Sequence, residues 1–190
     1  MKSKKKITLV ISISAMMIAL QFVFERYLSI PIGGSFRITS TFIPRAITGM
    51  CLNVLLCGFC SLSADVIGSV LFYGQVNPFI SLSALLRGIA FGFLFRNNKK
   101  PGPVKTVLIV LFDQLICGGI VTTIGLILFN GSPNTFSFWK LRFLQSIGLV
   151  LVELPVLFIM EKFLFPPIRS FLSVNGFFDS NKKEEKSSDN

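Results

Sequence analysis

The sequence predicts an all-α integral membrane protein with six transmembrane helices and both termini in the cytoplasm. Of the 190 residues, 52% are hydrophobic and 15% are charged, with a mean hydropathy of +0.70. Soluble domains carry about 25% charged residues, so this chain has too few to cover a water-facing surface. Its apolar residues form runs that approach or exceed the length a helix needs to cross a bilayer, about 20 residues. Its cations gather between these runs.

The first predicted span covers residues 7–24, which contain no charged side chain. A secretory signal peptide also begins with lysines and an apolar run. However, Glu25 and Arg26 follow directly, and no small-residue cleavage site does. We therefore expect a retained helix.

The next apolar stretch, residues 40–72, is too long for one span. A helix of these 33 residues would measure about 50 Å, against a hydrocarbon core of about 30 Å. We expect a break near Asn53, which gives spans at 41–52 and 54–72. The former is short, so it crosses only with protein around it.

The remaining spans are separated by two hydrophilic loops rich in turn residues. We expect spans at 80–95, 104–129 and 141–165, with loops at 96–103 and 130–135. Pro166 and Pro167 are expected to close the last span. Residues 1–172 then form a single membrane domain, and 173–190 a polar cytoplasmic tail, which its composition predicts to be disordered.

The distribution of cations gives the orientation. With six spans, the N-terminus, the loop at 96–105 and the C-terminus lie on one side, and these segments hold the clusters. By the positive-inside rule this side is the cytoplasm. The same distribution argues against a nucleic-acid partner, despite the net charge of +10. The clusters are Lys2, Lys4, Lys5, Lys6, Arg96, Lys99, Lys100, Lys105, Lys162, Arg169, Lys182, Lys183 and Lys186.

Most enzyme and metal-site motifs are missing. There is no histidine, the commonest general base and metal ligand. Cys57 and Cys60 form a CxxC pair, but no second pair completes a zinc site, so we expect reduced, buried thiols. Neither a P-loop nor a nucleophile elbow occurs. The sequence thus predicts no metal, no cofactor and no enzymatic activity. The alternative is an intramembrane enzyme that uses acidic side chains.

Ionisable side chains within the spans are candidates for function, because each costs some 2.5 kcal/mol or more at membrane depth. They are Arg45, Asp65, Arg87, Asp113 and Glu153. One interpretation is structural: the two arginines neutralise the three carboxylates. The other is a ligand pocket, since Asp65 and Arg87 lie at a similar depth on either side of the turn at 73–79. The alternative function, an intramembrane enzyme, would use the same three carboxylates for acid–base chemistry.

A pocket of this kind suits a ligand with hydrogen-bond donors and an anionic group. Asp65 would accept from the donors, and arginines would bind the anion in a two-pronged fashion. The candidate substrate-binding residues are Glu25, Arg26, Arg37, Asp65, Ser83 and Arg87.

Small residues recur at four-residue spacing on two predicted helices. Ala15 and Ala19 share one face of the first, and Ala84, Gly88 and Gly92 share one face of the fourth. Such faces let another helix approach closely. The approaching helix belongs either to a partner protein or to this chain.

Several blocks together resemble the S components of energy-coupling factor (ECF) vitamin transporters, specifically the folate type. The resemblance covers about residues 7–170. The blocks are 25–31, 37–44 with Gly49 and Met50, 64–68 and 82–88, together with the A-x-x-x-A pattern of Ala15 and Ala19.

The resemblance implies a six-helix protein of the cell membrane that binds folate from outside. It also implies partners: a transmembrane coupling protein, which Ala15 and Ala19 would meet, and two ATPase subunits that supply the energy. Asp65 would then meet the N–H donors of the pterin ring. Arg26, Arg37 or Arg87 would meet the glutamate carboxylates of folate.

The sequence also departs from the folate-type pattern. Cys51 and Leu52 stand where a Gly-Pro pair is usual, Arg45 where an apolar residue is commoner, and Arg87 where a small polar one is. These changes lie near the predicted pocket. They leave open an S component for another vitamin, such as pantothenate.

Overall fold

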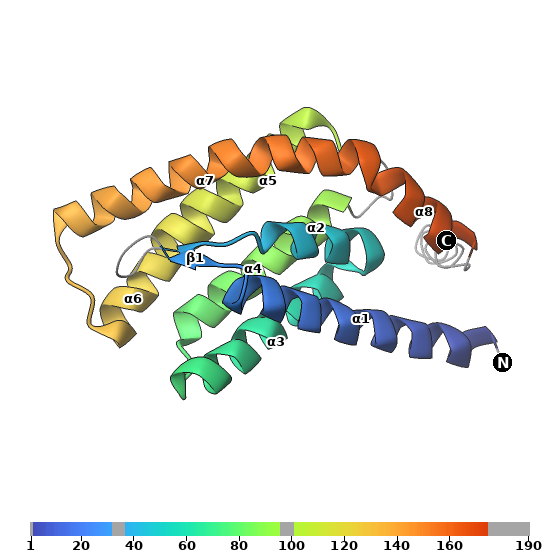
Figure 1. The fold of residues 1–190 in the computed structure, drawn as a ribbon, viewed down its shortest axis with the longest axis horizontal. Coiled ribbons are helices and arrows are strands. Elements are labelled where there is room, and N and C mark those ends of the chain that lie inside the picture. Colours follow the sequence, from blue (N-terminus) through green and yellow to red (C-terminus); the bar gives the residue numbers. More distant parts are fainter. Residues whose placement is uncertain (1, 32–36, 96–100, 175–190) are drawn as a thin grey trace, which may run out of the picture.

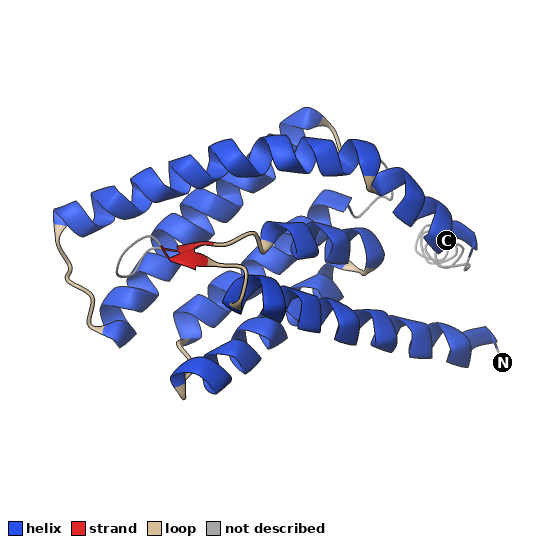
Figure 2. Ribbon diagram, viewed as in Figure 1, coloured by secondary structure: helices blue, strands red, loops and turns tan. Residues whose placement is uncertain are grey.

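The computed structural model describes residues 2–31, 37–95 and 101–174, which form an all-α fold with one two-residue antiparallel ladder (Figures 1 and 2). Residues 1, 32–36, 96–100 and 175–190 lie outside this description. The elements are α1 (Lys2–Arg26), β1 (Ile30–Pro31), β2 (Arg37–Ile38), α2 (Phe42–Cys51), α3 (Val54–Tyr73), α4 (Pro78–Phe95), α5 (Pro103–Leu111), the π-helix η1 (Phe112–Val121), α6 (Thr122–Asn130), α7 (Phe136–Phe163) and α8 (Phe165–Val174).

Five helical stretches in the described residues are long and apolar enough to cross a membrane, and they match five of the six predicted spans. They are Ile7–Arg26, Val54–Tyr73, Pro78–Phe95, Pro103–Asn130 and Phe136–Phe163. The predicted second span is α2, with 10 residues. At about 1.5 Å per residue it measures only about 15 Å. A sixth crossing at this position stays a prediction.

The predicted break between the second and third spans is confirmed, because Leu52 and Asn53 both have extended backbones. Two further helices end at a glycine with a left-handed backbone conformation. Gly74 after α3 has φ 67° and Gly131 after α6 has φ 63°. A left-handed residue of this kind is a common helix stop, and glycine adopts it without steric cost.

The last span differs from the prediction at both ends. It begins at Phe136 rather than at 141, and the break falls at Leu164. Pro166 and Pro167 do not close a helix but lie in the first turn of α8. There the missing backbone N–H groups have no intrahelical partner to lose. The predicted limit of the membrane domain, at 172, therefore falls inside α8, and the tail beyond 174 lies outside the described residues.

The small residues of α4 serve packing within the chain. A Cβ atom on Gly88 would lie 2.6 Å from the carbonyl oxygen of Cys57, and one on Gly92 would lie 2.7 Å from the Cα of Val54. The backbones of α3 and α4 touch here, as small-residue stripes allow. Ala15 and Ala19 on α1 are instead exposed.

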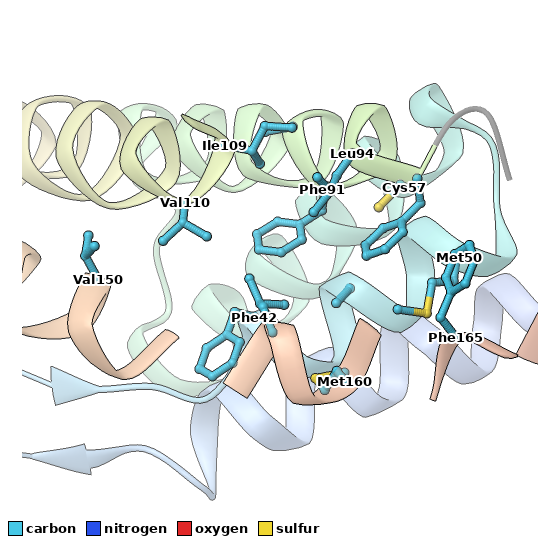
Figure 3. Close-up of a cluster of buried hydrophobic side chains, with 14 residues drawn as sticks. Phe42, Met50, Cys57, Phe91, Leu94, Ile109, Val110, Val150, Met160 and Phe165 are labelled. Carbon is cyan, nitrogen blue, oxygen red and sulfur yellow. The ribbon is translucent and has the colours of Figure 1, made fainter. Parts of the chain in front are cut away.

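Apolar side chains form both the outer surface and one part of the interior. Leu71 and Leu151 are 68% and 70% exposed, as expected for side chains that face lipid. A buried apolar cluster joins α2, α3, α4, α5, α7 and α8 (Figure 3). Its labelled members are Phe42, Met50, Cys57, Phe91, Leu94, Ile109, Val110, Val150, Met160 and Phe165.

The helix connections lie at two ends of the molecule. The start of α1 and the end of α8 lie toward one end, and the α3–α4 and α6–α7 connections toward the other (Figure 1). That both termini share a side stays a prediction, because residues 175–190 lie outside the described residues. That this side faces the cytoplasm stays a prediction from the cation clusters.

Candidate functional site

A cavity of about 140 Å³ lies between α2, α4, η1 and α7, next to the segment that joins β2 to α2. Its position is toward the end with the α6–α7 connection, since Arg142 lies in the second turn of α7. Most of its lining is polar or charged. The lining residues are Thr39, Thr41, Phe42, Arg45, Arg87, Asp113, Gln114, Gly118, Thr122, Arg142, Gln145, Ser146 and Leu149.

Helix α2 brings Arg45 into the cavity one turn after its start. Phe42 and Ala46 on the same helix belong to the apolar cluster, and their packing holds the helix in place. The Arg45 side chain is 6% exposed, and its Nε atom has no hydrogen-bond partner in the described chain. A buried donor without a partner is costly, so this guanidinium is available to a ligand.

Helix α7 supplies a mostly polar face. Arg142, Ser146, Leu149 and Glu153 follow at spacings of four, three and four residues, which place them on one helix face. The first three line the cavity, and Glu153 lies one turn deeper. The Arg142 guanidinium donates to Gln145 Oε1 at 3.5 Å and lies 5.7 Å from the Phe138 ring centroid.

The π-helix η1 forms another wall of the cavity. In this helix each N–H bonds five residues back, an arrangement that is rare and frequent at functional sites. The Cys117 carbonyl oxygen accepts the Thr122 N–H, the Thr122 hydroxyl at 2.8 Å and the Ser83 hydroxyl at 3.0 Å. The widened turn places Asp113, Gln114 and Thr122 together on the cavity side. Ser83, a predicted binding residue, thus lies buried directly behind Thr122.

Arg87 is the predicted binding residue that lines the cavity, and it forms an ion pair with Asp113. Arg87 Nε lies 3.6 Å from Asp113 Oδ1, with the side chains 17% and 0% exposed. The structural interpretation of the buried charges is confirmed for this pair. The same guanidinium borders the cavity, so the two interpretations are compatible here.

Gln114 links the two buried carboxylates of this region. Its Nε2 donates to Glu153 Oε2 at 2.6 Å and to Asp113 Oδ2 at 3.3 Å. Glu153 is 1% exposed and is connected to the cavity through Gln114.

Asp65 lies outside the cavity lining in the described structure. It is 2% exposed and accepts a hydrogen bond from the Ser81 hydroxyl at 2.6 Å. This bond joins α3 to α4. Glu25 is half-buried and lies within electrostatic reach of Asp65, Arg45 and Arg87, so it belongs to the same group of internal charges.

Arg26 packs against α3. Its Nη2 donates to Ser69 Oγ at 3.2 Å, and its guanidinium lies 5.0 Å from the Tyr73 ring centroid. Gly68 makes room for it, since a Cβ there would lie 2.5 Å from Arg26 Nε. Arg37 lies in β2, and its side chain falls outside the description. Among the predicted residues whose side chains are described, the structure brings Arg87 to the cavity.

Sequence reasoning missed several lining residues, notably Gln114, Arg142, Gln145 and Ser146. It considered ionisable groups deep in the spans, whereas two of these residues are amides and Arg142 lies near the predicted start of its span. The signal that could have found the α7 residues is the recurrence of polar side chains at 142, 146 and 153, spaced by four and seven residues.

Two comparisons with known proteins find relatives, and no family model matches the chain. The chain is 37% identical over 134 residues to the folate transporter FolT of Clostridium novyi (strain NT), an alignment that covers 69% of this chain and 68% of that protein. A crystal structure of FolT bound with folic acid matches with a TM-score of 0.73 and 25% identity. That match covers 82% of this chain and 95% of the FolT chain.

Proposed function

The chain belongs to the family of the folate transporter FolT, and from that premise we propose that it is the folate-binding S component of an ECF transporter. It is a multi-pass membrane protein that binds its vitamin and passes it on without chemical change. The observation that carries the proposal is the polar cavity between α2, α4, η1 and α7, with three arginines in its lining, in a fold that matches a FolT bound with folic acid.

The chemistry of the cavity suits one end of folate. Pockets that enclose a drug-sized ligand have about 300–1,000 Å³, and this cavity has about 140 Å³. Arg45, Arg87 and Arg142 offer N–H donors to carboxylate or ring acceptors. Some sequence-based assignments stay proposals: Arg26, Arg37 or Arg87 for the glutamate carboxylates, and Glu25 and Ser83 as further members of the site. The hydrogen bond from Ser81 instead favours a structural role for Asp65, which the sequence assigned to the pterin.

Transport needs partners, because the sequence contains no P-loop. We infer that a transmembrane coupling protein and two ATPase subunits of an ECF module supply the energy. The exposed face of α1 supports this, since Ala15 and Ala19 lie beside Ile11 and Met16, which are 62% and 66% exposed. A helix of a coupling protein can approach closely over the two alanines.

Binding of radiolabelled folic acid to the purified protein in detergent tests the proposal. We expect saturable, tight retention, release of unaltered folate on denaturation, and competition by unlabelled folate but not by pantothenate. Preferential retention of pantothenate would contradict folate as the ligand, and conversion of bound folate to a product would indicate an enzyme.

A further inference from the structure

The amide group of Gln114 is held in one orientation. Its Nε2 lies 2.6 Å from a Glu153 oxygen and 3.3 Å from an Asp113 oxygen. The Asp113 carboxylate, which forms the ion pair with Arg87, and the Glu153 oxygen both accept from Nε2, so the NH₂ end faces them. The carbonyl oxygen, Oε1, therefore points the opposite way. Within the described part of the chain, Oε1 accepts no hydrogen bond.

The space next to Oε1 is kept open by a glycine. A Cβ atom on Gly118 would lie 3.5 Å from Gln114 Oε1 and 2.9 Å from Arg87 Nη2. Gly118, Gln114 and Arg87 all line the cavity. An acceptor and a donor thus flank one gap, and a ligand edge that carries a donor beside an acceptor can enter it.

The charges around the cavity favour an uncharged ligand edge here. The Arg87 guanidinium, which borders the gap, is already paired with Asp113 at 3.6 Å, so it does not need an anionic ligand. A carboxylate placed in the gap would be repelled by the Gln114 carbonyl oxygen, which carries a partial negative charge. A neutral ring avoids this repulsion.

We propose that Gln114 determines which ring the site accepts: its Oε1 takes a hydrogen bond from a ring N–H while Arg87 donates to the adjacent ring carbonyl. This rests on the proposed function, because the pterin of folate carries such an N–H beside a C=O. Aminopterin, the 4-amino analogue of folic acid, has a bare nitrogen and an NH₂ group at these positions, so both contacts become repulsive. Asp113 and Glu153 are positioning residues that fix the amide.

The test compares dissociation constants for folic acid and aminopterin in the purified full-length protein. We expect the wild type to prefer folic acid by at least about tenfold, the equivalent of one good hydrogen bond. Gln114→Met should reduce this preference to less than about threefold, since methionine neither accepts nor repels strongly. Gln75→Met makes the same chemical change at an exposed residue outside the cavity lining and should keep the wild-type preference.

The outcomes separate this inference from the proposed function. A wild type that binds neither ligand contradicts the proposed function itself. A wild type that binds both equally, or a Gln114→Met variant that keeps the preference, overturns the inference. If Gln114→Met does not fold, Gly118→Ala serves instead, because alanine favours a helix over glycine. Its methyl group fills the gap, so folic acid should bind at least about tenfold more weakly, and unchanged affinity would refute the inference.

Discussion

Gly88→Ala should destabilise the protein, because the α3 and α4 backbones touch at this residue. The added Cβ would lie 2.6 Å from the Cys57 carbonyl oxygen and 2.8 Å from the Gly58 Cα. Ordinary contacts of this kind lie at about 3.5 Å or more, so the helices must move apart by several tenths of an ångström. The obstructing atoms are mostly backbone, so rotation of a side chain cannot relieve the overlap.

The expected cost follows from overpacking in well-packed interiors, about 1–3 kcal/mol. For a chain of this size, this corresponds to a melting temperature lower by about 2–12 °C. Thermal unfolding of the purified protein in one detergent, followed by the loss of its monodisperse elution peak, measures the change.

Gly148→Ala is the matched control. Gly148 lies within α7 and is exposed, and a Cβ added there would meet no neighbouring segment within 4 Å. Alanine favours a helix over glycine by about 1 kcal/mol, so this variant should melt at the wild-type temperature or above. A Gly88→Ala protein as stable as Gly148→Ala would refute the close approach of α3 and α4.

Three further predictions concern binding and coupling. Replacing Ala15 and Ala19 with tryptophan should abolish folate uptake by cells that carry the coupling module and leave the dissociation constant for folate unchanged; retained uptake would contradict the docking face. Arg142→Met should raise the dissociation constant for folate at least about tenfold, because one charge-assisted hydrogen bond is lost. Lys140→Met, at an exposed residue of the same helix, should leave this dissociation constant unchanged. Asp65→Asn should keep folate affinity within about threefold, because Asn can still accept from Ser81; a loss of tenfold or more would instead support the direct pterin contact predicted from the sequence.

The spans were predictable because they depend on local properties. Hydropathy and charge along the chain located the helices at 7–26, 54–73, 78–95 and 103–130 to within two residues of the ends observed. The family resemblance, stated from short blocks, is confirmed by the FolT relative. The ends of the last span were wrong, because proline is tolerated in the first turn of a new helix.

The site was less predictable, because it depends on contacts between distant segments. The sequence singled out Arg87, and it noted Arg45, Asp113 and Glu153 as charges that the membrane should not hold. It assigned Asp65 to the pocket from its depth alone. Depth does not give the direction in which a helical residue faces, and Asp65 faces Ser81 on α4.

The sequence by itself determined the membrane environment, the helical class and the family, since each follows from residue type and order along the chain. The tertiary structure decided which polar groups share a cavity. The hydrogen bond between Gln114 and Glu153 joins residues 39 positions apart, and the π-helical register of η1 turns Asp113 and Thr122 toward the same space. Both arise from packing between helices, where a polar group inside the membrane must find its partner on a neighbouring segment.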